Sequence, residues 1–292
     1  MSDVEMAVDF GAELGECPVW SGAEQVLYWE DIDGKRIHRL DPVTGVNESR
    51  TTSGRPGSFV LTDVPGRLLV AMENELVWFD WATGAEERWV ELEDAGAGNR
   101  LNDGRCDHRG RFIVGTMHPD TTQRKSVGSL YQVEPDGSVR KIQSDIGVPN
   151  GLAFDPERAR MYFADTFTAA VWVWDYDPDT GDRSNGRLFF DYGDVSGLPD
   201  GACLDADGCY WSASVHGWAV IRITPDGTLD RRIPVPVEMP TMPAFGGSNL
   251  DTLFVTSIDG PSRPARGDFI SGGLLAIDPG VQGQPEPLFG RS

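Results

Sequence analysis

Four residues with oxygen-bearing side chains stand at the same point of a recurring sequence pattern. Glu16 precedes CPVW, Asn102 precedes DGRCD, Asn150 precedes GLAF and Asp200 precedes GACLD. Successive members are 86, 48 and 50 residues apart, which fits two periods and then one period each of a repeat of about 40–50 residues. Hard divalent cations such as Ca²⁺, Mg²⁺ and Mn²⁺ prefer carboxylate and amide oxygens, and Zn²⁺ also accepts them. The pattern therefore predicts a cation site assembled from distant parts of the chain.

Local turn chemistry is the alternative explanation for each of these residues, because Asn-Gly and Asp-Gly are common turn dipeptides. Glu16, however, is followed by Cys-Pro, and four such coincidences at one position of a repeat favour a site. No serine lies in a G-x-S-x-G motif, so a hydrolase nucleophile of that kind lacks support. The histidines also lack the H-x-H or H-x-x-x-H spacing of a metal centre: His38, His108, His118 and His216.

The elements that must position these residues form a unit that occurs six times. Each unit contains a short apolar segment, an aromatic strand, a further strand and a turn that ends in glycine. The closing glycines are 39, 53, 44, 46 and 53 residues apart: Gly45, Gly84, Gly137, Gly181, Gly227 and Gly280. This spacing is typical of propeller blades. We predict an all-β, six-bladed β-propeller with four-stranded antiparallel blades around a central channel, forming a single domain over residues 1–292.

The short apolar segments are predicted to be the innermost strands: Cys17–Trp20, Ser58–Thr62, Gly104–Asp107, Gly151–Phe154, Ala202–Leu204 and Pro243–Phe245. Because the four oxygen donors enter such strands, they should meet at one mouth of the channel. The segment Val4–Phe10 is expected to add the outermost strand of the last blade and so close the ring. The aromatic residues of the other strands are expected to pack blade against blade: Trp29, Trp78, Tyr131, Tyr162, Trp172 and Trp174.

The charge of the chain argues against polyanionic partners. It has 46 acidic residues against 25 Lys and Arg, a net charge of −21, and its lysines are scattered at Lys35, Lys125 and Lys141. We expect no nucleic-acid partner, no membrane association and no obligate protein partner. The acidic N-terminus and the absence of a long apolar run favour a soluble, cytoplasmic protein. The four cysteines lack metal-site spacing and are expected to be buried, reduced thiols.

Seven stretches spread over nearly the whole chain resemble the SMP-30/gluconolactonase/regucalcin family. They are LGECPVW, NRLNDGRCD, GRFIVGTM, GSLYQV, VPNGLAF, LPDGACLDADG and AFGG, in the order of that family. Its members are six-bladed propellers that hydrolyse sugar lactones with one divalent metal. The resemblance thus implies a lactonase, a carboxylic ester hydrolase that opens an aldonolactone to the aldonic acid.

Carried over residue by residue, the resemblance gives roles to five positions. Glu16, Asn150 and Asp200 match the metal ligands, and Asp200 also matches the general base that deprotonates the attacking water. Arg100 and Asn102 match residues that contact the hydroxyl and carbonyl oxygens of the substrate. The resemblance implies one divalent cation, with Ca²⁺ as the first expectation and Zn²⁺, Mn²⁺, Mg²⁺ or Fe²⁺ as alternatives.

The loop after GTM departs from the pattern of the family. Mammalian members carry a substrate-binding Glu there, whereas this chain has Asp120, with His118 beside it. We expect both residues to contribute to substrate specificity from a lid over about residues 117–127. Two other functions stay open: metal-dependent hydrolysis of organophosphates or other esters, and a calcium-binding propeller without catalytic activity.

Overall fold

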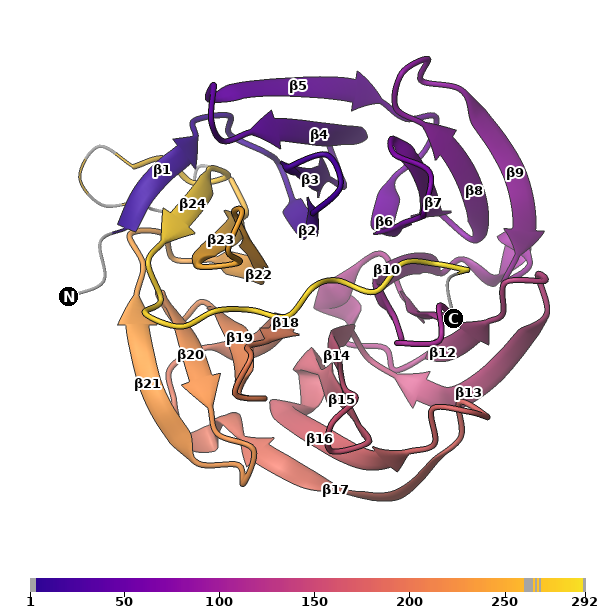
Figure 1. The fold of residues 1–292 in the computed structure, drawn as a ribbon. Coiled ribbons are helices and arrows are strands. Elements are labelled where there is room, and N and C mark those ends of the chain that lie inside the picture. The colour runs from indigo at the N-terminus through magenta and orange to yellow at the C-terminus, as the bar shows by residue number, and fades with distance from the viewer. Residues whose placement is uncertain (1–3, 260–264, 266, 268, 291–292) are drawn as a thin grey trace.

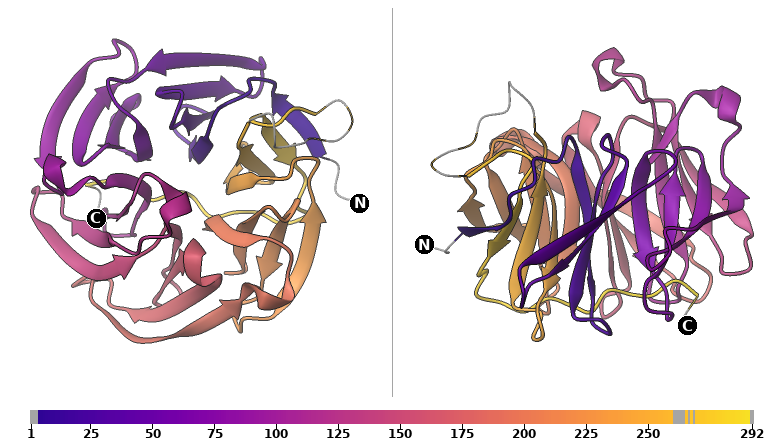
Figure 2. Two further views of the ribbon diagram at one scale, coloured as in Figure 1. Left: turned by 180° about the vertical axis from the view of Figure 1, so that it is seen from behind. Right: turned by 90° about the horizontal axis from the view of Figure 1, so that it is seen from above.

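The computed structural model describes residues 4–259, 265, 267 and 269–290. Six four-stranded antiparallel sheets are arranged as a ring (Figures 1 and 2), which confirms the predicted six-bladed propeller. The helices of the described residues are short 3-10 turns: η1 (Ala95–Ala97), η2 (Thr121–Gln123), η3 (Thr166–Thr168) and η4 (Tyr192–Asp194). That residues 1–292 form a single domain stays a prediction.

Each of the first five blades uses four consecutive strands that run outward from the centre of the ring (Figure 1). Blades 1 and 2 are β2 (Gly15–Ser21), β3 (Val26–Asp31), β4 (Arg36–Asp41), β5 (Val46–Thr51), β6 (Pro56–Leu61), β7 (Arg67–Met72), β8 (Glu75–Asp80) and β9 (Glu86–Glu91). Blades 3 and 4 are β10 (Arg100–Cys106), β11 (Phe112–Met117), β12 (Gly128–Val133), β13 (Val139–Ile146), β14 (Pro149–Asp155), β15 (Arg160–Asp165), β16 (Ala170–Tyr176) and β17 (Arg183–Asp191). Blade 5 is β18 (Leu198–Leu204), β19 (Tyr210–Val215), β20 (Ala219–Ile223) and β21 (Leu229–Pro234).

The sixth blade joins strands from the two ends of the chain. Its order is β22 (Pro240–Gly246), β23 (Thr252–Ser257), β24 (Leu274–Ile277) and then β1 (Val4–Val8) at the rim. Val4 pairs with Ile277 and Val8 pairs with Leu274. The expected closure by the N-terminal segment is therefore confirmed.

Apolar residues of neighbouring blades pack together to form the core. Trp29, Tyr28 and Tyr162 are fully buried, and Tyr131 is 5% exposed, as expected for contacts between blades. Trp172 contradicts this expectation, because it is 37% exposed and pairs with the exposed Leu188 at the rim of blade 4. Alternation along a strand explains the difference, since the buried neighbours of Trp172 take the core-facing side of β16.

Every innermost strand contains a β-bulge near its start. The pairing register shifts between Glu16 and Val19, and the other five strands have the same irregularity. These shifts lie at 56–58, 101–104, 150–153, 199–202 and 240–243. The candidate site residues thus lie inside the strands rather than before them, at the point where a bulge redirects the side chains.

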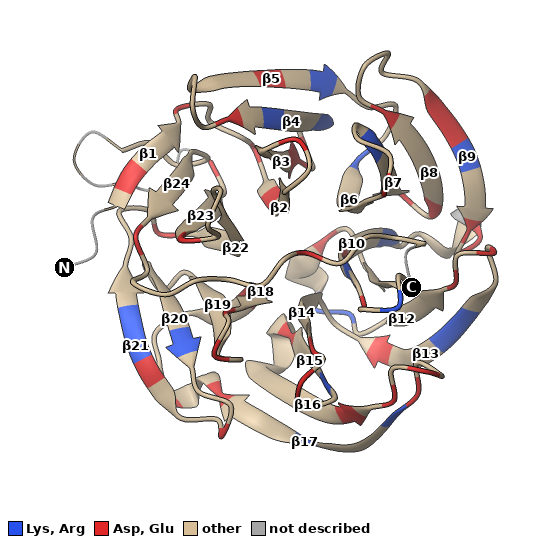
Figure 3. Cartoon of the chain, in the orientation of Figure 1, with Lys and Arg blue, Asp and Glu red and all other residues tan. Residues whose placement is uncertain are grey.

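Charged residues lie mainly on the outer strands and connecting loops (Figure 3). In the part of the chain that the structure describes, no helix is long and apolar enough to cross a membrane. The four cysteines are free and buried, as expected.

The C-terminal segment, residues 281–290, crosses one face of the ring (Figure 1). Gly283 N donates to Leu250 O at 2.7 Å near its start, and Phe289 N donates to Leu61 O at 2.8 Å near its end. The ring of Phe289 packs against Trp78 and Trp89, with centroid distances of 5.8 and 5.6 Å. The loops that follow β11 and β15 project from the opposite face (Figure 2).

Closure by β1 makes a prediction about stability. Deleting residues 1–9 should lower the Tm by about 5–10 °C, because the deletion removes a whole hydrogen-bonded strand and its apolar contacts with blade 6. Thermal denaturation followed by circular dichroism checks this. Glu5→Ala, an exposed change in the same strand, is the control and should leave the Tm nearly unchanged. A deletion variant as stable as the full chain would contradict this view of ring closure.

Candidate metal and substrate site

The four oxygen donors predicted from the sequence occupy equivalent places on blades 1, 3, 4 and 5. Each lies where the bulge of its innermost strand begins. Asn102, Asn150 and Asp200 are buried, with exposed fractions of 4–8%, whereas Glu16 is partly exposed. The structure therefore brings them together around the axis of the ring, as the repeat predicts.

The two blades without a donor at this point carry Gly57 and Thr241. A Cβ at Gly57 would lie 2.3 Å from Leu101 O, so glycine is required for the close approach of blades 2 and 3. Thr241 Oγ1 is used in the scaffold, because it donates to Gly15 O at 2.5 Å and bonds Thr256 Oγ1 at 2.8 Å. Blades 2 and 6 therefore supply no free side-chain oxygen at this point.

Asn102 and Asn150 are held by hydrogen bonds between blades. Asn102 Nδ2 donates to Pro149 O at 3.0 Å and to Asn150 Oδ1 at 3.3 Å. Asn150 Nδ2 donates to Thr166 Oγ1 at 2.8 Å, and Thr166 Oγ1 donates to Pro199 O at 2.8 Å. The bond from Nδ2 fixes the orientation of the Asn150 amide, and its Oδ1, which accepts from Asn102, is the atom that could also bind a cation.

The residue after each donor must accommodate the bulge. Gly151 has φ +63°, and a Cβ there would lie 2.3 Å from the Tyr210 hydroxyl, which donates to Gly151 O at 2.7 Å. Cys17 takes the equivalent place with φ +44°. Its thiol lies 3.4 Å from Phe59 O and 3.3 Å from Phe59 N, so it joins blades 1 and 2 as a core cysteine.

Burial and like charge act together on the two carboxylates of the set. Burial, followed by the charges of Asp200 and Asp103, raises the pKa of Glu16 well above its ordinary value. Burial and the charge of Asp103 likewise raise the pKa of Asp200, against a lowering by Arg100. A cation between these groups would relieve both effects.

The residues present fit a hard divalent cation. Glu16 and Asp200 supply carboxylate oxygens and Asn150 supplies an amide oxygen, while water could complete the shell. Within the described ranges, no group of three or more His, Cys, Asp or Glu side chains is placed to hold a metal. A cation at this place therefore depends on the amide oxygen of Asn150.

Arg100 brings a positive charge to the edge of the site. Its Nη1 donates to Asn102 Oδ1 at 2.7 Å and to Leu101 O at 2.9 Å. The residue is 7% exposed, and it forms no ion pair with a described side chain. Its burial lowers the pKa of the guanidinium. Arg100 and Asn102 thus form one hydrogen-bonded unit that can hold a polar ligand.

Asp120 and His118 lie in the loop between β11 and β12, and they take no part in the hydrogen bonds of Arg100, Asn102 and Asn150 described above. Asp120 caps η2, where its carboxylate accepts from Thr122 N at 3.0 Å and from Gln123 Nε2 at 2.8 Å. His118 Nδ1 lies 3.1 Å from Asp120 N, and its Nε2 lies 3.4 Å from Lys125 Nζ. Their part in specificity stays a prediction.

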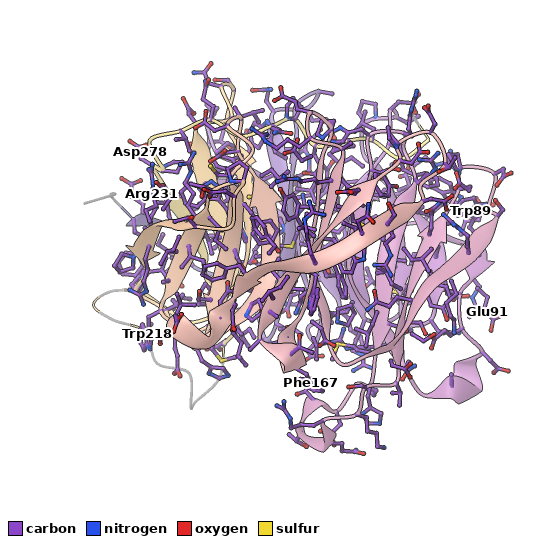
Figure 4. The ribbon with its side chains drawn as sticks, turned by 90° about the horizontal axis from the view of Figure 1, so that it is seen from below. Trp89, Glu91, Phe167, Trp218, Arg231 and Asp278 are labelled. Carbon is purple, nitrogen blue, oxygen red and sulfur yellow. The ribbon has the colours of Figure 1, made fainter. Side chains whose placement is uncertain are left out.

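The lid loop also contacts blade 4. The guanidinium of Arg124 lies 4.6 Å from the ring centroid of Phe167, a residue of η3. Figure 4 places Phe167 on the face from which these loops project. Since η3 also contains Thr166, which holds Asn150, the loop and the site share a support.

Glu30 is the residue at the site that sequence reasoning missed. It pairs with Glu16 across β2 and β3, is fully buried, and neither carboxylate oxygen has a hydrogen-bond partner among the described residues. Burial raises its pKa, while the charge of Arg100 opposes the rise. The available signal was an acid at a core-facing position of the apolar strand VLYWED.

Two further acids, Asp103 and Asp165, differ in how the fold uses them. Asp103 is buried near the site carboxylates, and its Oδ1 has no partner in the described part of the chain. Asp165 serves local structure instead, because it accepts from Gly147 N at 2.9 Å and from Phe167 N at 3.0 Å.

Comparison with known proteins identifies the family. The model of the SMP-30/gluconolactonase/LRE-like region matches residues 14–259. The chain belongs to this family. A 6-deoxy-6-sulfogluconolactonase of Pseudomonas putida is 39% identical over 279 residues, which are 94% of each chain. A pentonolactonase of Haloferax volcanii is 36% identical over 290 residues, which are 97% of each chain.

The fold is also that of a solved family member. The crystal structure of a regucalcin from Agrobacterium tumefaciens, described as a calcium-binding protein, superposes with a TM-score of 0.88. It is 29% identical, and the match covers 99% of this chain and 97% of the other. The predicted enzyme class agrees with the family, since the two relatives above are named as lactonases.

The crowding of acids makes a prediction about the metal-free protein. A carboxyl whose pKa is raised by folding favours the folded state at low pH and opposes it as the pH rises through the raised value. Glu16→Gln and Asp200→Asn should therefore raise the Tm of chelated protein by a few degrees at pH 8. The gain should shrink strongly toward pH 4, where the carboxyls are protonated in the folded state and about half protonated in the unfolded state.

Thermal melts in chelator from pH 4 to pH 8 test this prediction. The control is Asp63→Asn, which removes one exposed carboxylate in the loop between β6 and β7. If neither site variant gained stability at pH 8 relative to this control, the proposed charge repulsion would be absent.

Proposed function

We propose that this protein is a metal-dependent sugar lactonase that opens an aldonolactone to its aldonic acid. The observation that carries the proposal is the meeting of Glu16, Asn150 and Asp200 at one register of three blades. Membership of the family and the names of its lactonase members support it. When bound there, a divalent cation would polarise the lactone carbonyl and stabilise the developing oxyanion.

The side chains divide the remaining tasks. Asp200 accepts the proton of the attacking water and so acts as the general base. Arg100 and Asn102, already joined by a 2.7 Å hydrogen bond, hold the hydroxyl and carbonyl oxygens of the substrate. Burial of all three side chains limits competing water and strengthens their electrostatic effect.

The proposed substrate is a hydroxylated lactone rather than an apolar ester. The groups around the cation position are carboxylates, amides and a guanidinium, which pair with sugar hydroxyls. A cytoplasmic location, one bound divalent cation with Ca²⁺ as first choice, and specificity set by His118 and Asp120 belong to the same proposal. The calcium-binding description of the regucalcin supports this choice of cation.

Asp200→Asn should lower kcat about 10²–10⁴-fold, the usual effect of losing a general base. The assay follows lactone opening after chelation and re-addition of one metal at a time. Suitable substrates are xylono-, arabinono-, galactono-, fucono- and gluconolactone, with paraoxon as the test for organophosphate hydrolysis. Near wild-type turnover by the variant would remove Asp200 from the role of base, and a preference for paraoxon would replace the lactonase assignment.

Arg100→Met should lower kcat/KM for the best lactone about 10–100-fold, because a charge-assisted hydrogen bond to the substrate is lost. Arg55→Met is a matched control, since Arg55 lies at the start of blade 2 and is paired with Glu73 at 3.2 Å. The control should retain most of its activity. Equal losses in the two variants would indicate a general effect of charge at the mouth of the ring.

A further inference from the structure

A buried ion pair connects the centre of the ring to the C-terminal segment. Arg105, on β10, has a side chain that is only 7% exposed, and its Nη1 donates to the two oxygens of Glu286 at 2.7 and 2.6 Å. Its Nη2 donates to Ala202 O at 2.9 Å. One guanidinium thus links blade 3, blade 5 and the C-terminal segment.

The bond to Ala202 ties Arg105 to the strand of the proposed base. Ala202 lies two residues after Asp200 on β18, just beyond the bulge that directs Asp200 to the site. Arg105 itself lies three residues after Asn102 on β10. The ion pair is therefore attached to two of the strands that supply the candidate site.

Asp103 connects Arg105 electrostatically to the carboxylates of the site. The guanidinium of Arg105 opposes the rise that burial causes in the pKa of Asp103. Asp103 in turn raises the pKa of both Glu16 and Asp200. The positive charge of Arg105 thus lies between two sets of acids. These are Asp103 with the site carboxylates on one side and Glu286 of the C-terminal segment on the other.

An unneutralised Arg105 would act against cation binding. Charges interact strongly in a buried environment, so a positive guanidinium below the site would lower its attraction for a dication. A buried charge that loses its partner is left uncompensated. Without Glu286, the acid whose charge still acts on Arg105 is Asp103.

We propose that Glu286 is a positioning residue of the metal site, which neutralises the charge of Arg105 so that this charge does not weaken cation binding. The inference rests on the proposed metal site at Glu16, Asn150 and Asp200. The smaller cavity that Arg105 and Glu286 both line has a volume of about 40 Å³, enough for a few water molecules.

The C-terminal segment has other anchors, which provide a matched control. Gln284 Nε2 donates to Asp205 O at 2.8 Å, and this bond does not involve Arg105. A mechanical role of the segment would depend on Gln284 and Glu286 alike. The proposed role depends on Glu286 and on the charge of Arg105.

The test measures Mn²⁺ binding to chelated, full-length protein by calorimetry or electron paramagnetic resonance, with circular dichroism as the check of folding. Glu286→Gln should raise the Kd for Mn²⁺ about tenfold or more, because Arg105 is then unneutralised. The double variant Arg105→Met with Glu286→Gln removes both charges and should return the Kd to within about threefold of wild type. Gln284→Ala should leave the Kd unchanged.

The outcomes separate the two hypotheses. Unchanged binding by Glu286→Gln, or equal weakening in the single and double variants, would overturn the proposal while leaving the metal site intact. No Mn²⁺ binding by wild type would overturn the metal site and, with it, this inference. If Glu286→Gln does not fold, Arg105→Met alone decides: binding at least as tight as wild type supports the proposal, and weaker binding rejects it.

Discussion

The bulge in each innermost strand is the constraint on which the rest of this structure depends. An antiparallel strand in regular register would send successive side chains to alternate faces of the blade. One additional residue at the same place in all six blades breaks this alternation, and in four of them it accompanies an oxygen donor near the axis. The same irregularity allows close contacts between blades, such as the hydrogen bond from Ser58 Oγ to Asn102 O at 2.7 Å. Assembly of the ring and assembly of the site thus follow from one backbone feature.

The chemistry at the centre comes from local charge rather than from the acidity of the whole chain. Most acids lie on outer strands and loops, where solvent screens them (Figure 3). The centre holds Glu16, Glu30, Asp103 and Asp200 against Arg100 and Arg105. Burial amplifies this small excess of negative charge, which a bound divalent cation would offset.

The sequence predicts the fold because the turn glycines repeat at blade spacing. It predicts that four oxygen donors lie close together because they share one position of that repeat: Glu16, Asn102, Asn150 and Asp200. Features that depend on pairing between strands were harder to foresee. Glu30 became part of the site through its register opposite Glu16. Glu286 lies outside the repeat, so no spacing indicated that its segment would cross the ring. Asp120 could not be placed either, because a carboxylate in a short loop satisfies the nearest backbone N–H groups.

The closure of blade 6 has a consequence for synthesis of the protein. During translation β1 emerges first, yet its partner β24 begins only at Leu274, so the strand waits unpaired while nearly the whole chain is made. Glu16 is likewise made long before Asp200, the other carboxylate of the candidate site. Contacts of such long sequence separation form slowly, and partly made chains expose apolar blade faces that favour aggregation. Nascent molecules therefore expose such faces until late in elongation, and the proposed cation site cannot be complete before Asp200 has been made.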